Sequence, residues 1–227
     1  MDGVNVIQKN QSEINLNILK SMLSDMIENV RINLSKSIES LEELNLELAE
    51  EIIQNDVIID KLQRKIERQV INYVTRFQPL AKDLRYIVSI VKFANDLERI
   101  GDHAVNIAKI ATKYKGLPSS YSFINIRKMT GYTEKMMKDI FDAYYKSDIN
   151  KAKKVYKMDK KVDNLYKLIR KNIAYVIKEE NDTEKAALFL DLILVSRYLE
   201  RAADHTKNIA SEIYYVETGI SLKEVTL

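Results

Sequence analysis

The sequence predicts an all-α protein built from two tandem three-helix bundles that are related by internal duplication. Apolar residues recur at three- and four-residue steps almost throughout the chain, which is the period of amphipathic helices. The 227 residues include only 5 Gly and 2 Pro, so few turns separate long elements. A third observation is a repeat: DLERIGDHAVNIA at 96–108 returns as YLERAADHTKNIA at 198–210, with eight of thirteen positions identical.

In the first half, apolar periodicity predicts three helices, over roughly 12–44, 46–76 and 79–115. Pro79 suits the first turn of the third helix, and Gly116 and Pro118 are typical of its end. At ~1.5 Å per residue this helix would be about 55 Å long. No sustained alternation, hairpin turn or glycine-rich phosphate loop predicts a strand or a nucleotide site.

The second half repeats this plan, with helices expected over roughly 123–146, 148–180 and 182–217. Asp182 followed by Thr183 and Glu184 is typical of a helix start. The segment from Gly116 to Ser122 is the expected joint, so the predicted domains are 1–116 and 117–227.

Four pairs of carboxylates at i, i+4 spacing occupy matching places in the two halves: Asp56/Asp60, Glu98/Asp102, Asp159/Asp163 and Glu200/Asp204. Such pairs repel by roughly a few tenths of a kcal/mol, so their recurrence calls for a compensating cation. If the second and third helices of each half lie side by side, four carboxylates converge on each bundle. All-oxygen sites of this kind suit Mg²⁺, Mn²⁺ or iron. Arg99 and Arg201 offer the alternative of neutralising the same carboxylates, and the spacing alone leaves both open.

The only two histidines, His103 and His205, fall at the same place in the repeat. Each is either a hydrogen-bonded surface residue or a group in or near the site. Di-iron bundles use Glu-x-x-His, in which the histidine follows at i+3. Here His103 follows Glu98 at i+5, so the two side chains lie on diverging faces of the helix. No serine has a His–acid partner and no other activated nucleophile is evident, so the sequence predicts that the protein is not an enzyme.

Composition excludes several classes. The absence of Cys excludes disulfides and thiolate metal sites, and no apolar run approaches the length of a membrane span. The polar N-terminus lacks the apolar core of a signal peptide, so a cytoplasmic location is expected. The net charge of +3 does not indicate nucleic acid binding. Residues 146–171, however, carry ten Lys/Arg against three Asp. They are interpreted as a solvated lysine face, with an acidic partner or membrane headgroups as the alternatives.

Two long stretches resemble the signatures of the PhoU family. The first is QPLAKDLR at 78–85 followed by NDLERIGDHAVNIAK at 95–109, and the second is RYLERAADHTKNIA at 197–210. With the two halves and the D-x-x-x-D helices, the resemblance covers nearly the whole chain. The opening of the first helix departs from the family, because Asn15-Leu-Asn-Ile-Leu19 replaces a Phe-containing stretch.

The resemblance implies a regulator of phosphate uptake that also keeps the phosphate-starvation response off. Its expected partners are the phosphate ABC transporter ATPase and the phosphate-sensing histidine kinase. Association with the membrane is expected only through these partners, and the protein is expected to form a homodimer. The resemblance further implies iron or zinc, ahead of Mg²⁺ or Mn²⁺, at the four carboxylate pairs, with Asn106 and Asn208 extending the same stripes. Site-adjacent or partner-binding roles are expected for Arg85, Arg99, His103, Arg201 and His205. The alternative function is a helical-bundle metalloprotein with an iron-dependent redox or storage role.

Overall fold

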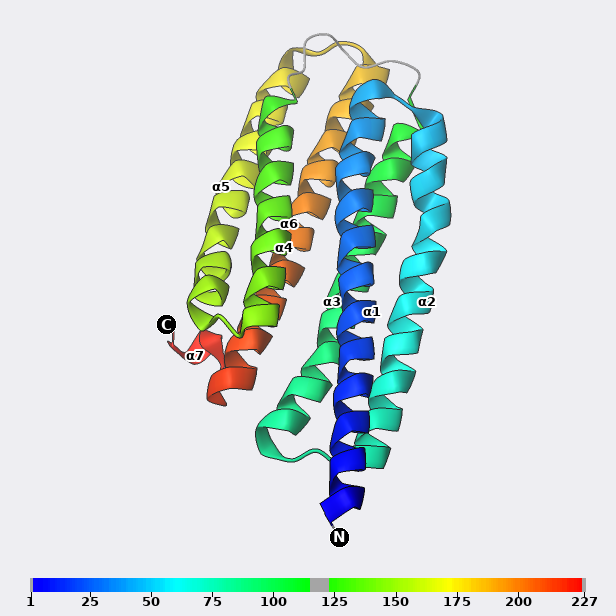
Figure 1. Ribbon diagram of the computed structural model, residues 1–227. Helices are drawn as coiled ribbons and strands as arrows, with labels where there is room; N and C mark the ends of the chain where they lie inside the picture. Colours follow the sequence, from blue (N-terminus) through cyan, green and yellow to red (C-terminus); the bar gives the residue numbers. More distant parts are fainter. Residues whose placement is uncertain (1, 115–122, 226–227) are drawn as a thin grey trace.

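The computed structural model describes residues 2–114 and 123–225, and in these ranges the chain is helical with no strand (Figure 1). Six long helices and one short one follow each other along the chain: α1 (Asp2–Glu43), α2 (Leu46–Phe77), α3 (Ala81–Ala111), α4 (Ile124–Lys146), α5 (Ile149–Glu179), α6 (Thr183–Thr218) and α7 (Leu222–Val225). The predicted all-α class is therefore confirmed. Among the described residues, no helix combines the length and apolar character that crossing a membrane requires.

The predicted helix bounds hold except at a few ends. Helix α1 begins ten residues earlier than predicted, because the polar segment before residue 12 continues the helix past the part that shows apolar periodicity. The prediction that Pro79 starts α3 was wrong by two residues. Leu80, which follows the proline, is extended (φ −120°, ψ 156°), so α3 begins only at Ala81, while Gln78 ends α2 in a left-handed conformation (φ 47°). The predicted joint at 116–122, and with it the domain boundary, lies outside the described residues.

Helix α6 begins as its sequence indicates. Asp182 caps it, accepting hydrogen bonds from the backbone N–H groups of Glu184 (2.9 Å) and Lys185 (3.3 Å). Gly219 ends it with φ 75°, a left-handed conformation that glycine adopts without steric cost. The chain then turns back into α7, which the sequence did not predict, and Leu222 of α7 is fully buried.

The six long helices form two three-helix bundles, α1–α3 and α4–α6, that lie side by side (Figure 1). Helix α3 packs along α6 and α1 meets α4, so the equivalent third helices of the two halves form the centre of the contact. The buried apolar residues of both halves belong to one continuous core. The repeated motif lies on α3 and α6, at the place where the halves meet.

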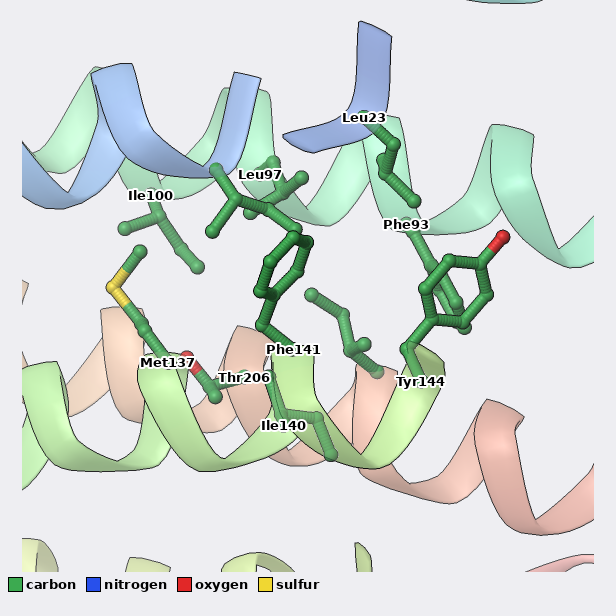
Figure 2. A pocket seen from close by; sticks show the side chains of 11 residues that line it. Leu23, Phe93, Leu97, Ile100, Met137, Ile140, Phe141, Tyr144 and Thr206 are labelled. Carbon is green, nitrogen blue, oxygen red and sulfur yellow. The ribbon is translucent and has the colours of Figure 1, made fainter. Parts of the chain in front are cut away.

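Apolar side chains from both halves fill the seam between them (Figure 2). Leu97 and Ile100 of α3 face Met137 and Phe141 of α4 across a residual cavity of about 10 Å³, which is no larger than a water molecule requires. Ion pairs border this seam on the surface, including Lys92 to Glu212 at 2.9 Å. The apolar seam therefore has no room for a small-molecule ligand.

Candidate functional site

The first acidic cluster consists of Asp56 and Asp60 on α2 with Glu98 and Asp102 on α3. The packing of α2 against α3 brings the two predicted pairs near each other. The pKa of Asp56 on α2 is raised first by burial and then by the charge of Asp102 on α3. Arg99 partly neutralises the cluster, lying 3.5 Å from Glu98 Oε2 and 3.5 Å from Asp102 Oδ2. The carboxylates of α2 and α3 therefore lie near one another, and Arg99 neutralises part of their charge.

Asp56 is the least satisfied member of this cluster. Its Oδ1 is buried and has no hydrogen-bond partner among the described residues. Burial, followed by the charges of Asp102 and Asp60, raises the pKa of Asp56, and burial likewise raises the pKa of Glu98. A buried carboxylate oxygen without a donor is costly unless a proton or a cation reaches it. The donor set and this orphaned oxygen fit a hard or borderline cation.

Gly101 lets α3 approach α2 closely at this point. A Cβ added to Gly101 would lie 3.1 Å from Ile59 Cδ1 and 3.6 Å from Asp56 Oδ1. The second half has Ala203 at the equivalent position. The close approach at Gly101 places the backbone of α3 directly beside the orphaned oxygen of Asp56.

The second acidic cluster consists of Asp159 and Asp163 on α5 with Glu200 and Asp204 on α6. It differs from the first in containing an ammonium group. The Nζ of Lys207 donates a short hydrogen bond to Oδ2 of Asp159, a side chain that is only 3% exposed. Burial lowers the pKa of Lys207, but its bond to Asp159 and the charges of Asp159 and Asp204 outweigh this effect, so the pKa is raised and the lysine stays charged.

Lys207 was missed by the sequence predictions, although a signal was present in the repeat. Its counterpart in the first half is Val105, so the two copies of the motif differ here by a charge. Arg197 adds a second cation by donating to Glu200 Oε1 at 2.8 Å. The other oxygen of Glu200 and Oδ1 of Asp159 remain buried without partners among the described residues.

The expected metal site is not assembled in ligating geometry. In the part of the chain that the structure describes, no three His, Cys, Asp or Glu side chains are placed to hold one metal ion. Of the two asparagines assigned to the same stripes, Asn208 turns toward the other half and donates to Asp96 Oδ1 at 3.4 Å. Asn106 is half-buried. Metal binding stays a prediction for both clusters.

The two histidines lie in the seam between the halves and contact each other across it. The rings of His103 and His205 are 5.6 Å apart, and His103 also stacks on Tyr198. His205 Nδ1 donates to Asp96 of the other half at 2.8 Å. Burial, followed by the charges of His205 and two arginines, lowers the pKa of His103 to about 4. A neutral, half-buried His103 contributes to the contact between the halves, whereas the sequence left its role open.

The three arginines singled out in the sequence occupy different environments. Arg85 is in the seam, where its guanidinium lies 3.4 Å from the carbonyl oxygen of Val216 on α6. Arg99 is exposed and pairs with the first acidic cluster. Arg201 is exposed on α6; burial raises the pKa of Glu200, and the charge of Arg201 opposes part of that rise. Arg99 and Arg201 therefore remain available on the surface, while Arg85 serves the packing of the halves.

A groove of about 940 Å³ lies beside the second acidic cluster, between α5, α6 and α7. We call it the lysine groove. Its lining is Tyr156, Lys157, Asp159, Lys160, Asp163, Asn164, Lys167, Lys207, Lys223 and Val225. The lining thus contains five lysine ammonium groups and two carboxylates. One of these carboxylates, that of Asp159, is already hydrogen-bonded to Lys207.

The fold and the two clusters define the class of this protein, which is an internally duplicated helical-bundle protein that presents one carboxylate cluster in each half. The chain matches the PhoU domain over residues 23–111 and again over 126–213, one match for each bundle. The chain belongs to the PhoU family. This result confirms the resemblance on which the sequence predictions relied.

Similar proteins cover the whole architecture. A phosphate-specific transport system accessory protein PhoU homolog of Thermotoga maritima is 38% identical over 213 residues, covering 93% of this chain and 91% of the relative. A PhoU homolog of Clostridium acetobutylicum is 39% identical over 182 residues, covering 80% and 82%. The crystal structure of PhoU from Pseudomonas aeruginosa superposes with a TM-score of 0.86 at 30% identity, covering 92% of this chain and 99% of that one.

Proposed function

We propose that this protein is an accessory regulator of phosphate uptake by a phosphate transport system, and that it keeps the phosphate-starvation response off. The observation that carries the proposal is the match of both halves to the PhoU domain, together with relatives of nearly full length whose names place them in phosphate-specific transport. The regulator acts by protein contact with the transporter ATPase and with the phosphate-sensing histidine kinase. It works in the cytoplasm, as a homodimer, and reaches the membrane only through these partners.

The test is made in cells. Deleting the gene and growing the strain in ample phosphate should raise secreted phosphatase activity, and the intact gene supplied in trans should return that activity to the repressed level. Unchanged phosphatase activity in the deletion strain, with no second family member in its genome, would contradict the proposal. Purified protein mixed with the transporter ATPase then tests the direct contact, because a regulator that acts by contact co-elutes with its target.

The carboxylates of the two clusters would hold a metal ion in this protein. In the first acidic cluster Asp56, Asp60, Glu98 and Asp102 supply the oxygens, and the orphaned Oδ1 of Asp56 supports the proposal. A bound cation would neutralise the repulsion between the four carboxylates and hold α2 against α3. Arg99 pairs with Glu98 and Asp102 at the exposed edge of the cluster, and buried apolar side chains lie beneath it.

Elemental analysis of protein purified without chelator tests this part. We expect iron or zinc in the native protein and a lower content in the double variant Asp60→Asn/Asp102→Asn, which leaves the carboxylates of the second acidic cluster in place. A metal content that is substoichiometric in the native protein, or the same in the double variant, would rule out a site at the first acidic cluster. The iron-dependent redox or storage alternative predicts oxygen consumption with bound iron. It lacks structural support, because His103 contacts Tyr198 and His205 in the seam rather than the carboxylates.

A further inference from the structure

The middle helices of the two halves carry opposite charge patterns. Helix α2 has six acidic and five basic residues, whereas α5 has ten basic and three acidic ones. Lys154, Lys157 and Lys160 of α5 stand where α2 has Glu51, Gln54 and Val57. The two helices have the same fold and the same acidic pairs, so bundle formation does not require these lysines. The packing of the bundle therefore does not account for the positive charge on the surface of α5.

The lysines of the groove are not satisfied within the molecule. Lys207 is bonded to Asp159, but Lys157, Lys160, Lys167 and Lys223 form no ion pair with any described carboxylate. Asp163 is the remaining acidic group of the lining. By contrast, Lys151 of the same helix is paired with Asp142 at 2.9 Å, and Lys153 and Lys161 lie over tyrosine rings. Of the α5 lysines without a described partner, Lys157, Lys160 and Lys167 line the groove, whereas Lys154 and Lys171 lie outside it.

From this arrangement we propose that the lysine groove binds an elongated phosphate anion, of the class of linear condensed phosphates. Lys157, Lys160 and Lys167 lie at i, i+3 and i+10 on α5, so they span about 15 Å along one side of the helix. A single orthophosphate cannot reach both ends of such a row, whereas a chain of several phosphates can. Lysine binds phosphate as a point charge without strict geometry, which suits a flexible chain.

The shape of the groove favours a soluble chain over a membrane surface. The four unpaired lysines are exposed, and they come from two helices that flank a hollow of about 940 Å³. An extended chain can follow this hollow and meet lysines of both helices, whereas a flat array of headgroups does not fill it. Single-stranded nucleic acid is disfavoured as well, because binding of bases depends on free aromatic faces. The ring of Tyr156, the one aromatic lining residue described, lies under Lys207 at 5.3 Å.

The experiment is calorimetric titration of the intact purified protein with orthophosphate, pyrophosphate, tripolyphosphate and a longer linear polyphosphate. We expect affinity to rise with chain length and to fall with added salt, because exposed charges are screened. The variant Lys157→Gln/Lys160→Val installs the residues of the first half. It removes two of the exposed charges that line the groove, so the Kd should rise about tenfold. Lys223→Gln, on a different helix, should weaken binding less.

The control is Lys154→Gln/Lys171→Gln, which removes the same charge from exposed positions of α5 outside the groove and should change the Kd less than about twofold. Equal loss in this control, affinity independent of chain length, or no binding of the longer chain would overturn the proposal. So would tighter binding of phosphatidylglycerol vesicles or single-stranded RNA, each tested in the same buffer. The assay uses the purified protein alone, so failure of the proposed transporter contact does not affect its outcome.

Discussion

Replacing Lys207 by Met removes the ammonium group that is bonded to Asp159 in the second acidic cluster. The carboxylate left behind is 3% exposed, and its other oxygen already has no partner among the described residues. Removing one member of a buried ion pair costs about 3–5 kcal/mol. Lys207 is 28% exposed, so solvent screening reduces the expected loss to about 2 kcal/mol. Met preserves most of the apolar stem, so the loss reports mainly on the charge.

Urea unfolding followed by helical circular dichroism measures this loss in metal-free protein at pH 7. For a chain of this size, about 2 kcal/mol corresponds to a decrease in Tm of about 4–8 °C. The double variant Asp159→Asn/Lys207→Met removes the unpaired charge as well and should recover most of the free energy of unfolding. This pairing distinguishes an uncompensated charge from a general loss of packing.

The pH dependence provides a second check. Burial raises the pKa of Asp159, while Lys207 opposes that rise. Without Lys207 the folded-state pKa rises further, so the ionised carboxylate costs stability above that pKa. The deficit of Lys207→Met should therefore be largest at neutral pH and shrink as the pH falls toward the unfolded value near 3.8. A loss below about 0.5 kcal/mol, or a double variant no more stable than Lys207→Met, would refute the reasoning.

Three further predictions concern the first half and the seam. Asp56→Asn should stabilise metal-free protein by roughly a few tenths of a kcal/mol at pH 7, because it removes a buried carboxylate whose raised pKa makes ionisation costly; in Tm measurements the gain should vanish below that pKa. Gly101→Val should lower the free energy of unfolding by about 1–3 kcal/mol, because the added side chain collides with Ile59. Ala203→Gly, at the equivalent position of the second half, should lower it by only about 1 kcal/mol. The midpoints of urea unfolding compare the two variants. His103 should stay neutral down to about pH 4 in an NMR titration of its ring, and stability should fall as the pH drops from 6.5 toward that value; titration near 6.5 would place the ring in solvent.

The local level of the structure could be read from the sequence. Five of the six long helices start within two residues of their predicted positions, and Asp182 caps α6 as its side chain indicates. Helical periodicity and capping depend on neighbouring residues, so they are visible without tertiary information. The start of α1 at Asp2 was missed because apolar periodicity becomes regular only from about residue 12.

The roles of individual side chains in the site depended on packing. Asp56 and Asp159 match in the repeat, yet Asp56 has an orphaned oxygen beside Gly101 while Asp159 is bonded to Lys207. The repeat contains the clue, in Val105 against Lys207, but the clue acquires meaning only when α6 is placed against α5. Likewise, nothing local to His103 indicates that its neighbour is His205 of the other half.

The sequence by itself determined that this protein is all-α, internally duplicated and marked by four acidic pairs, because the 3.6-residue period and the repeat offset are properties of the chain alone. Only the tertiary structure decided that α3 and α6 meet along the seam, that the histidines serve this contact, and that the lysines of α5 line a groove with α6 and α7. The physical reason is that these juxtapositions result from many weak contacts between distant segments, and the total of those contacts, rather than any local pattern, selects one packing.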